Sequence, residues 1–406
     1  MTQDGNRVFA SYWMAGFEGA DHVNGSGHPL EINRANGHWD RLHEDYAALR
    51  ACGIHTVRES VGWRLFDEAG REGRQRLLTH ARIAAEHGIQ VVWTLMHYGV
   101  PKGIDLFSER FVDAFTRHCE NVVELLHWVD GPPPVYQPIN EISFFTWAAT
   151  ETGLIHPYLP SSVERGATLK RQLVRATLRG CDAIWAIAPE ARILHTDPMV
   201  HIVAPPGADE AVRASAATQH EAQFQAWDMI AGRMAPELGG SPRYLDVMGL
   251  NYYHNNQWEH GTGERLHWHL GDERRRAFED LASDMWRRYG RPLAVAETGH
   301  IGEGRAQWLD HMAESALACE AMGVPLEGIC LYPALDRHDW ENPRHWHRSG
   351  LWDLPGADTG DLTRHPEPGF SARLRHWQAI LPRHGPHSAQ RVAHPPDAVT
   401  AHASGH

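Results

Sequence analysis

Eight short, almost continuously apolar runs recur along this chain, and longer amphipathic stretches separate them. The runs cover residues 8–16, 54–60, 89–98, 135–141, 192–197, 244–253, 292–298 and 328–336. Strands that are apolar on both faces are typical of a parallel sheet covered by helices. Eight such strands with helices between them predict an α/β fold, a single (β/α)₈ TIM barrel.

Several intervening stretches carry signals for helix ends. Asp40 is expected to cap a helix that stops at Gly53, Ser108 to cap the helix that follows it, and Gly323 to end another. Residues 1–382 contain no linker that would divide them, so they are expected to form one barrel. Residues 383–406 lack an apolar period and are rich in Pro, His and Ala, which predicts a flexible C-terminal tail.

Composition excludes some classes of partner. A formal net charge of −13 argues against nucleic acid, because phosphate binding requires clustered Lys and Arg. No run approaches the roughly 18 to 20 apolar residues that cross a bilayer, and the start of the chain lacks a signal peptide pattern. We therefore expect a cytoplasmic protein without a membrane partner, with its 5 scattered cysteines reduced. The oligomeric state stays open.

The chain is rich in Trp and His, with 16 and 30 residues, respectively. Trp side chains suit the stacking of sugar rings, whereas abundant His invites a metal interpretation. There is no H-E-x-x-H motif, and the "HWH" triplets at residues 267–269 and 345–347 do not follow apolar runs. A metal-dependent barrel hydrolase would need H-x-H at the end of the first strand, where "WMAGFEGA" has none. No metal and no cofactor are expected.

Polar residues gather at the ends of the predicted strands, where the active site of this fold lies. They are Arg58 and Glu59; His97 and Tyr98; Asn140 and Glu141; Asn251, Tyr252 and Tyr253; Glu297; and Asp336, with Asp339 and Trp340 just beyond. Two of these carboxylates, Glu141 and Glu297, come from the fourth and seventh strands. A pair of carboxyl groups is what glycosidic bond cleavage needs, and a separation of about 5 to 5.5 Å gives retention through a covalent intermediate.

Six segments in order resemble glycoside hydrolase family 1, the β-glucosidase-like barrel enzymes of clan A, over most of residues 8–354. "HWDRLHEDYAALRACGIHTVRESVGWR" resembles "H-Y-x-R-x-x-E-D…G…Y-R-F-S-I-S-W-x-R", and "TLMHYGVP" resembles "T-L-x-H-W-D-L-P". "PINE", "VMGLNYY" and "VAETG" are similar to "T-F-N-E-P", "F-x-G-L-N-Y-Y" and "I-T-E-N-G". "LYPALDRHDW" followed by "RSGLWDL" is similar to "x-W-S-L-L-D-N-F-E-W" followed by "R-F-G-L-x-x-V-D". The chain is identified as a divergent member.

The resemblance implies that Glu141 is the acid/base and Glu297 the nucleophile. Asn140 would bind the sugar 2-hydroxyl, a contact that tightens in the transition state. Glu297 beside a cation would stay charged, whereas the pKa of Glu141, in a partly dry site facing that charge, would rise so that it stays protonated near neutral pH.

The remaining implied residues support the pair or bind the sugar. Arg58 and Tyr253 would lie against Glu297, with Asn251 beside them, and His97 would contact a ring hydroxyl. The alternative interpretation makes Arg58 an ion-pair partner inside the barrel, Asn251 and Tyr253 strand-end hydrogen bonders, and His97 a structural residue.

Departures from the family pattern concentrate in sugar recognition. The Gln that grips two hydroxyls falls at Gly16, the Trp after the third-strand His is Tyr98, and the Trp platform under the sugar aligns with Tyr332. The Glu for the distal hydroxyls aligns with the shorter Asp339. The expected substrate-binding residues are His97, Tyr98, Glu18, Tyr332, Asp339 and Trp340. Glucose specificity is therefore not implied, because changed hydrogen-bonding groups change which sugar fits.

The sequence thus predicts a retaining, exo-acting β-glycosidase whose partner is a small soluble β-glycoside. A transglycosidase would use the same residues and differ only in whether water or an alcohol reaches the intermediate. A non-catalytic sugar-binding barrel is the alternative from another class, and the retention of both glutamates with Arg58, Asn140 and Tyr253 weighs against it.

Overall fold

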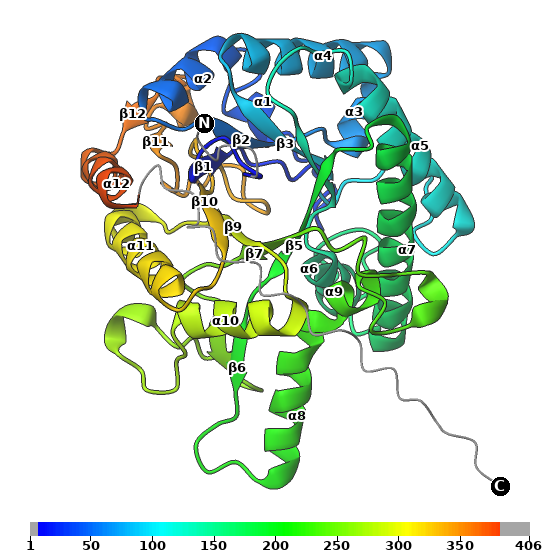
Figure 1. Cartoon of the computed structure of the whole chain (residues 1–406), viewed down its shortest axis with the longest axis vertical. Coiled ribbons are helices and arrows are strands. Elements are labelled where there is room, and N and C mark those ends of the chain that lie inside the picture. Colours follow the sequence, from blue (N-terminus) through cyan, green and yellow to red (C-terminus); the bar gives the residue numbers. More distant parts are fainter. Residues whose placement is uncertain (1–6, 382–406) are drawn as a thin grey trace, which may run out of the picture.

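A computed structural model describes residues 7–381. Within them, eight parallel strands close into a barrel ringed by helices (Figure 1), so the predicted TIM barrel is confirmed. The strands are β1 (Trp13–Gly16), β2 (Thr56–Ser60), β3 (Gln90–Met96), β4 (Val135–Ile139), β5 (Arg192–Pro198), β7 (Val247–Asn251), β9 (Leu293–Thr298) and β10 (Leu326–Leu331). The predicted tail, residues 383–406, lies outside the described residues.

Barrel closure occurs between β1 and β10. Ala15 pairs with Val57 of β2 on one side and with Leu331 of β10 on the other. Each of the eight apolar runs overlaps one barrel strand, although β10 begins before its run and the first run begins well before β1. Its leading residues Val8 and Phe9 join the apolar side chains inside the barrel instead.

Helices follow most strands. They are α1 (Ile32–Ala35), α2 (Leu42–Ala51), α3 (Trp63–Ala69), α4 (Arg71–Glu86), α5 (Glu109–Leu126), α6 (Ile142–Trp147), α7 (Val163–Ile187), α8 (Glu210–Glu221), α9 (Gln225–Ile230), α10 (Phe278–Tyr289), α11 (Arg305–Ala321) and α12 (Pro368–Ile380). Figure 1 shows α8 and strand β6 (His201–Val203) extending away from the barrel. None of the helices within residues 7–381 is both long and apolar enough to cross a membrane.

The predicted helix ends are only partly right. Ser108 caps α5 by accepting a hydrogen bond from the amide of Phe111 at 3.3 Å. Asp40 does not cap α2, so that expectation is wrong: the helix begins after Arg41 and has no side-chain cap. Acidic residues Glu44 and Asp45 in its first turn complement the helix dipole instead.

Two pairs of short strands were not expected from the sequence. Strand β6 pairs in parallel with β8 (Gln257–Glu259), and β11 (Trp352–Asp353) pairs with β12 (His365–Pro366). Two- and three-residue strands leave no apolar run long enough to detect.

Side chains alternate between the barrel interior and the helix layer, which decides where the polar strand-end residues point. In β2, Arg58 reaches Gln137 of β4 inside the barrel, whereas its neighbour Glu59 contacts His38 and Tyr46 on the helix side. Arg58 is therefore available to the barrel mouth and Glu59 is not.

Candidate active site

Glu141 and Glu297 both lie at the carboxyl end of the barrel, separated by β5 and β7 in the order of strands. Glu141 follows β4 directly, and Glu297 is the next-to-last residue of β9. Asn251, at the end of β7, links them: it pairs with Glu297 in the sheet register, and its amide donates to Glu141 Oε1 at 2.9 Å. Their side chains are buried, with residue exposures of 8% and 6%.

Glu297 is held by a cation and a hydroxyl. Arg58 Nη1 forms an ion pair with Oε1, and the Tyr253 hydroxyl donates to Oε2 at 2.8 Å. Burial alone would lower the pKa of the Arg58 guanidinium, but the Glu297 charge outweighs burial and raises that pKa above its usual value. Arg58 is thus a fixed positive charge beside one of the two carboxylates, as the resemblance implies.

Glu141 sits in a contrasting environment. Burial first, and then the negative charge of Glu297, raise its pKa from 4.5 to about 8, although hydrogen bonds from Tyr98 and Asn251 act in the opposite direction. This carboxyl group therefore holds its proton at neutral pH. The direction agrees with the sequence-based expectation that the fourth-strand glutamate stays protonated.

Asn140 is fixed by a network that crosses the barrel. Its Oδ1 accepts from Arg58 Nη2 at 2.6 Å and from Gln137 Nε2 at 2.8 Å, while its Nδ2 lies 3.0 Å from His97 Nε2. Burial and the Arg58 charge lower the pKa of His97 far below 6.5, so its ring is neutral. Gln137 was missed in the sequence. The sequence does mark Gln137, because it is the one amide side chain in the otherwise apolar strand β4 and it faces the barrel interior.

Tyr98 contacts the acid/base candidate directly, a contact the sequence did not predict. Its hydroxyl donates to Glu141 Oε2 and accepts from Asn140 Nδ2 at 2.9 Å. Tyr98 and Glu141 also have left-handed backbone, with φ of 72° and 46°. Such strain in non-glycine residues persists only where the surroundings enforce it, and it clusters at functional sites. The strained residues Tyr98 and Glu141 thus follow β3 and β4, and their side chains form a hydrogen bond.

Two departures from the family pattern, Gly16 and Tyr332, depend on each other. A Cβ on Gly16 would lie 2.3 Å from Cδ2 of Tyr332, so only glycine leaves room for this ring. The Tyr332 hydroxyl accepts from the Gly19 amide at 3.1 Å and donates to the Phe17 carbonyl at 3.2 Å. Its ring lies 5.2 Å from the Arg58 guanidinium. Tyr332 therefore occupies the space beside β1 that a larger residue at position 16 would fill.

Glu18 and Asp339 are engaged by the protein itself. Glu18 pairs with Arg337 at 3.2 Å. Asp339 accepts from the amides of Glu341 and Asn342 at 2.8 and 2.9 Å, so its short side chain stabilises its own loop. The contacts described in residues 7–381 do not join Asp339 to the two glutamates, and its expected role in sugar binding stays a prediction.

Trp340 does join the site. Its ring centroid lies 5.8 Å from that of Tyr98 and 6.3 Å from that of Phe144, which follows Glu141 on α6. These rings form an aromatic wall on the acid/base side. Trp340 therefore keeps the position that its place in the sequence implies.

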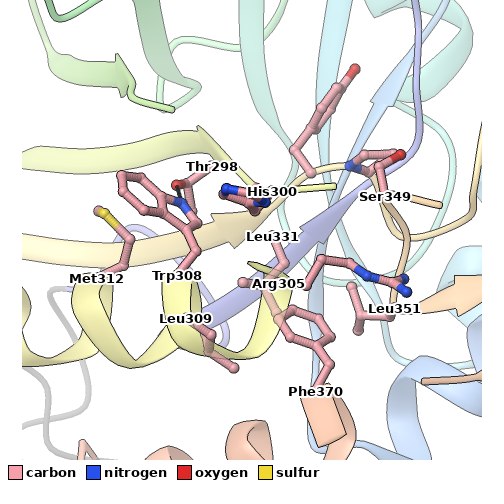
Figure 2. A pocket seen from close by; sticks show the side chains of 13 residues that line it. Thr298, His300, Arg305, Trp308, Leu309, Met312, Leu331, Ser349, Leu351 and Phe370 are labelled. Carbon is pink, nitrogen blue, oxygen red and sulfur yellow. Dashed lines mark hydrogen bonds between the residues drawn. The ribbon is translucent and has the colours of Figure 1, made fainter. Parts of the chain in front are cut away.

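A separate pocket lies beside α11, on the helix side of β9 (Figure 2). Its lining includes Thr298, Trp308, Met312 and Phe370, and Trp308 Nε1 donates to Thr298 Oγ1 at 2.9 Å. The Glu141 and Glu297 side chains do not line it. The hydrogen bond between Trp308 and Thr298 joins α11 to β9, the strand that carries Glu297.

In the described part of the chain, one group has residue types and spacing suited to a metal ion: His38, Glu59 and His80. Glu59 Oε1 lies 3.0 Å from His38 Nε2 and accepts from the Tyr46 hydroxyl at 2.8 Å. Burial lowers the pKa of His38, but Glu59 and Asp45 together raise it to about 9. A protonated His38 between two carboxylates accounts for these contacts, and the group lies outside the barrel wall.

Comparisons with known proteins extend this picture at the level of fold. No protein-family model matches the sequence, and no curated protein matches it significantly. Among solved structures, a β-glucosidase from Thermotoga maritima in complex with glucoimidazole is similar, with a TM-score of 0.70 and 15% identity over 91% of this chain and 97% of that one. A β-glycosidase from Pyrococcus horikoshii has a TM-score of 0.70 and 17% identity, covering 90% and 92%.

A further solved structure, described as a family 1 β-glucosidase from Thermotoga maritima, has a TM-score of 0.68 and 15% identity, covering 89% of this chain and 96% of that one. The shared fold spans nearly the whole length of each neighbour. The chain therefore shares the barrel fold of these three proteins, with little sequence identity.

Proposed function

We propose that this protein is a retaining β-glycosidase that hydrolyses a small soluble β-glycoside. The observation that carries the proposal is the contrast between the two buried glutamates. Glu141 has a pKa raised to about 8 and keeps a proton, whereas Glu297 is paired with the fixed charge of Arg58. One acid and one anion, delivered from different strands, are the groups that glycoside cleavage uses.

In the first step, a Glu297 oxygen forms a bond to the anomeric carbon while the glycosidic C–O bond breaks. Glu141 gives its proton to the departing oxygen, so the aglycone leaves as a neutral alcohol. The Tyr253 hydroxyl orients the attacking carboxylate through the hydrogen bond to Oε2. In this proposal Asn140, whose side chain is held by Arg58 and Gln137, binds the 2-hydroxyl, as the family resemblance implies.

In the second step, Glu141 is ionised and acts as a base. It takes a proton from a water molecule as the water oxygen attacks the anomeric carbon, and the bond to Glu297 breaks. Two displacements restore the β configuration. If an alcohol replaced water, the same residues would perform transglycosylation. A sugar-binding barrel without catalysis would not require an acid with a raised pKa facing a paired anion.

The test is turnover of a panel of 4-nitrophenyl β-glycosides, with NMR of the first-formed sugar. We expect a β product, and we expect Glu297→Gln and Glu141→Gln to lose turnover while keeping the fold. Glu124→Gln, an exposed glutamate on α5, is the matched control and should retain full activity. Formation of the α sugar, or full activity in both site variants, would contradict the proposal.

A further inference from the structure

Three polar atoms next to the proposed active site have no hydrogen-bond partner among residues 7–381. They are Nδ1 and Nε2 of His22 and Nε1 of Trp340, and all three are buried. His22 is only 1% exposed. A buried polar atom without a partner is costly, and native proteins rarely leave such atoms unsatisfied. Two adjacent side chains with three such atoms therefore indicate a place that takes a polar ligand.

His22 lies close to the acid/base candidate. Its ring centroid is 5.0 Å from that of Trp340 and 6.0 Å from that of Tyr98, whose hydroxyl donates to Glu141. The loop that carries His22 is attached to the loop after β3, because Gly99 donates its amide proton to Asp21 Oδ1 at 3.1 Å. His22 thus contacts Tyr98, and Tyr98 contacts Glu141.

The protonation of His22 defines the chemistry of the ligand. Burial, followed by the charge of Arg64, lowers its pKa to about 3, so the ring is neutral. A neutral imidazole offers one N–H donor and one acceptor nitrogen, and the Trp340 indole adds a second donor. Hydroxyl groups, which both donate and accept, can satisfy all three atoms. An anion would satisfy the two donors and leave the acceptor nitrogen unpaired, and a cation would satisfy that nitrogen alone.

We propose that His22, together with the indole N–H of Trp340, binds hydroxyl groups of the glycone on the side away from the scissile bond. This inference rests on the proposed glycosidase function and specifies its sugar subsite. Gly16 cannot supply the two hydroxyl contacts that the family pattern places at its position, and Tyr332 fills that space. His22 supplies the missing contacts from the loop after β1.

The burial of His22 also limits the substrate class. Because the His22 ring is only 1% exposed, the hydroxyl group that it binds is inferred to carry no further sugar. The substrate is therefore a neutral terminal sugar with free hydroxyls, released one unit at a time.

The experiment compares wild type with His22→Phe, which keeps an aromatic ring but removes both nitrogens. His118→Phe is the matched control: His118 is equally buried, its pKa is also lowered to about 3, and it lies on α5 with Nε2 bonded to the Leu95 carbonyl. Substrates are the preferred 4-nitrophenyl glycoside and its 3-deoxy, 4-deoxy and 6-deoxy analogues.

In wild type, at least one deoxy analogue should lose about 10- to 100-fold in kcat/KM, the range expected for an unpaired buried group. His22→Phe should lose a similar factor on the parent glycoside and show no further loss on that analogue. His22→Gln, which again offers a donor and an acceptor, should recover part of the activity. His118→Phe should discriminate among the four substrates as wild type does. An equal loss on all four substrates with His22→Phe would overturn the inference and assign His22 to packing around internal water.

If wild type hydrolyses none of these glycosides, the proposed function fails, and calorimetry with glucose, galactose, mannose and xylose tests the subsite alone. Binding of one sugar that is lost in His22→Phe and kept in His118→Phe would support the subsite. Equal binding by wild type and His22→Phe, or no binding of any sugar to wild type, would overturn it.

Discussion

Replacing Glu141 with Gln is expected to stabilise the protein, and the gain should grow between pH 5 and pH 8. The folded-state pKa of Glu141 is about 8, whereas its ordinary value is 4.5. Between these values the native state binds a proton that the unfolded chain has released. Stability therefore falls as pH rises through this window, and it is unaffected below pH 4.5. Glutamine removes the ionisable group and hence this loss.

The magnitude follows from the shift. Ionisation of Glu141 stabilises the unfolded state by about 1.36 kcal/mol for each pH unit above 4.5, so at pH 7 it lowers the free energy of unfolding by roughly 3 kcal/mol. At pH 5 the same term is below about 1 kcal/mol. With an unfolding entropy of about 2.1 cal/mol/K per residue, 3 kcal/mol corresponds to a rise of about 4 °C in Tm for a chain of this size. Glutamine fits the site, since its amide can accept from Asn251 and donate to the Tyr98 oxygen.

The assay is calorimetric or circular dichroism melting of wild type and Glu141→Gln at pH 5, 7 and 8. The exposed Glu124→Gln on α5 is the control, and its Tm difference from wild type should not grow with pH. A Tm difference for Glu141→Gln that is the same at all three pH values, or that becomes negative at pH 8, would refute this reasoning.

Three further predictions concern the same site. First, kcat/KM should fall as pH rises through about 8, where Glu141 loses its proton. Tyr98→Phe removes a hydrogen bond that lowers the pKa of Glu141, so in this variant the fall should occur at higher pH. A fall at the same pH in both proteins would contradict this. Arg58→Met should cost about 3 to 5 kcal/mol in denaturant unfolding, since it leaves its partner carboxylate buried and unpaired, and a loss under 1 kcal/mol would be inconsistent with the ion pair. Gly16→Ala should lower the free energy of unfolding by about 1 to 3 kcal/mol, because the new methyl group overlaps with the Tyr332 ring. In a Tyr332→Ala background the same Gly16→Ala change should have no cost. If the two losses simply add, the overlap is excluded.

The positions of the two glutamates could be predicted because they depend on local pattern. Each barrel strand left an apolar run, and most of these runs ended at polar residues that the fold delivers to one face. Glu141, Glu297 and Arg58 followed from that rule. The alternation of side chains along β2 likewise separates Arg58 from Glu59.

Contacts between distant loops could not be read in the same way. The overlap of Gly16 with Tyr332 joins positions 316 apart in the sequence, and the single substitutions looked independent until the barrel brought β1 beside β10. The hydroxyl of Tyr98 donates to Glu141, and both residues adopt a left-handed backbone that no local pattern in the sequence indicates. The hydrogen bonds that Asp339 accepts from the amides of Glu341 and Asn342 were likewise not predicted, and its expected contact with the sugar stays a prediction.

The most direct measurement is covalent trapping with activated 2-deoxy-2-fluoro β-glycosides, followed by intact and peptide mass spectrometry. A retaining mechanism with Glu297 as nucleophile predicts one fluorosugar adduct per chain, located on the peptide that contains Glu297 and absent from Glu297→Gln. Attachment at another residue, or turnover of the parent glycoside without any adduct and with inversion at the anomeric carbon, would contradict it.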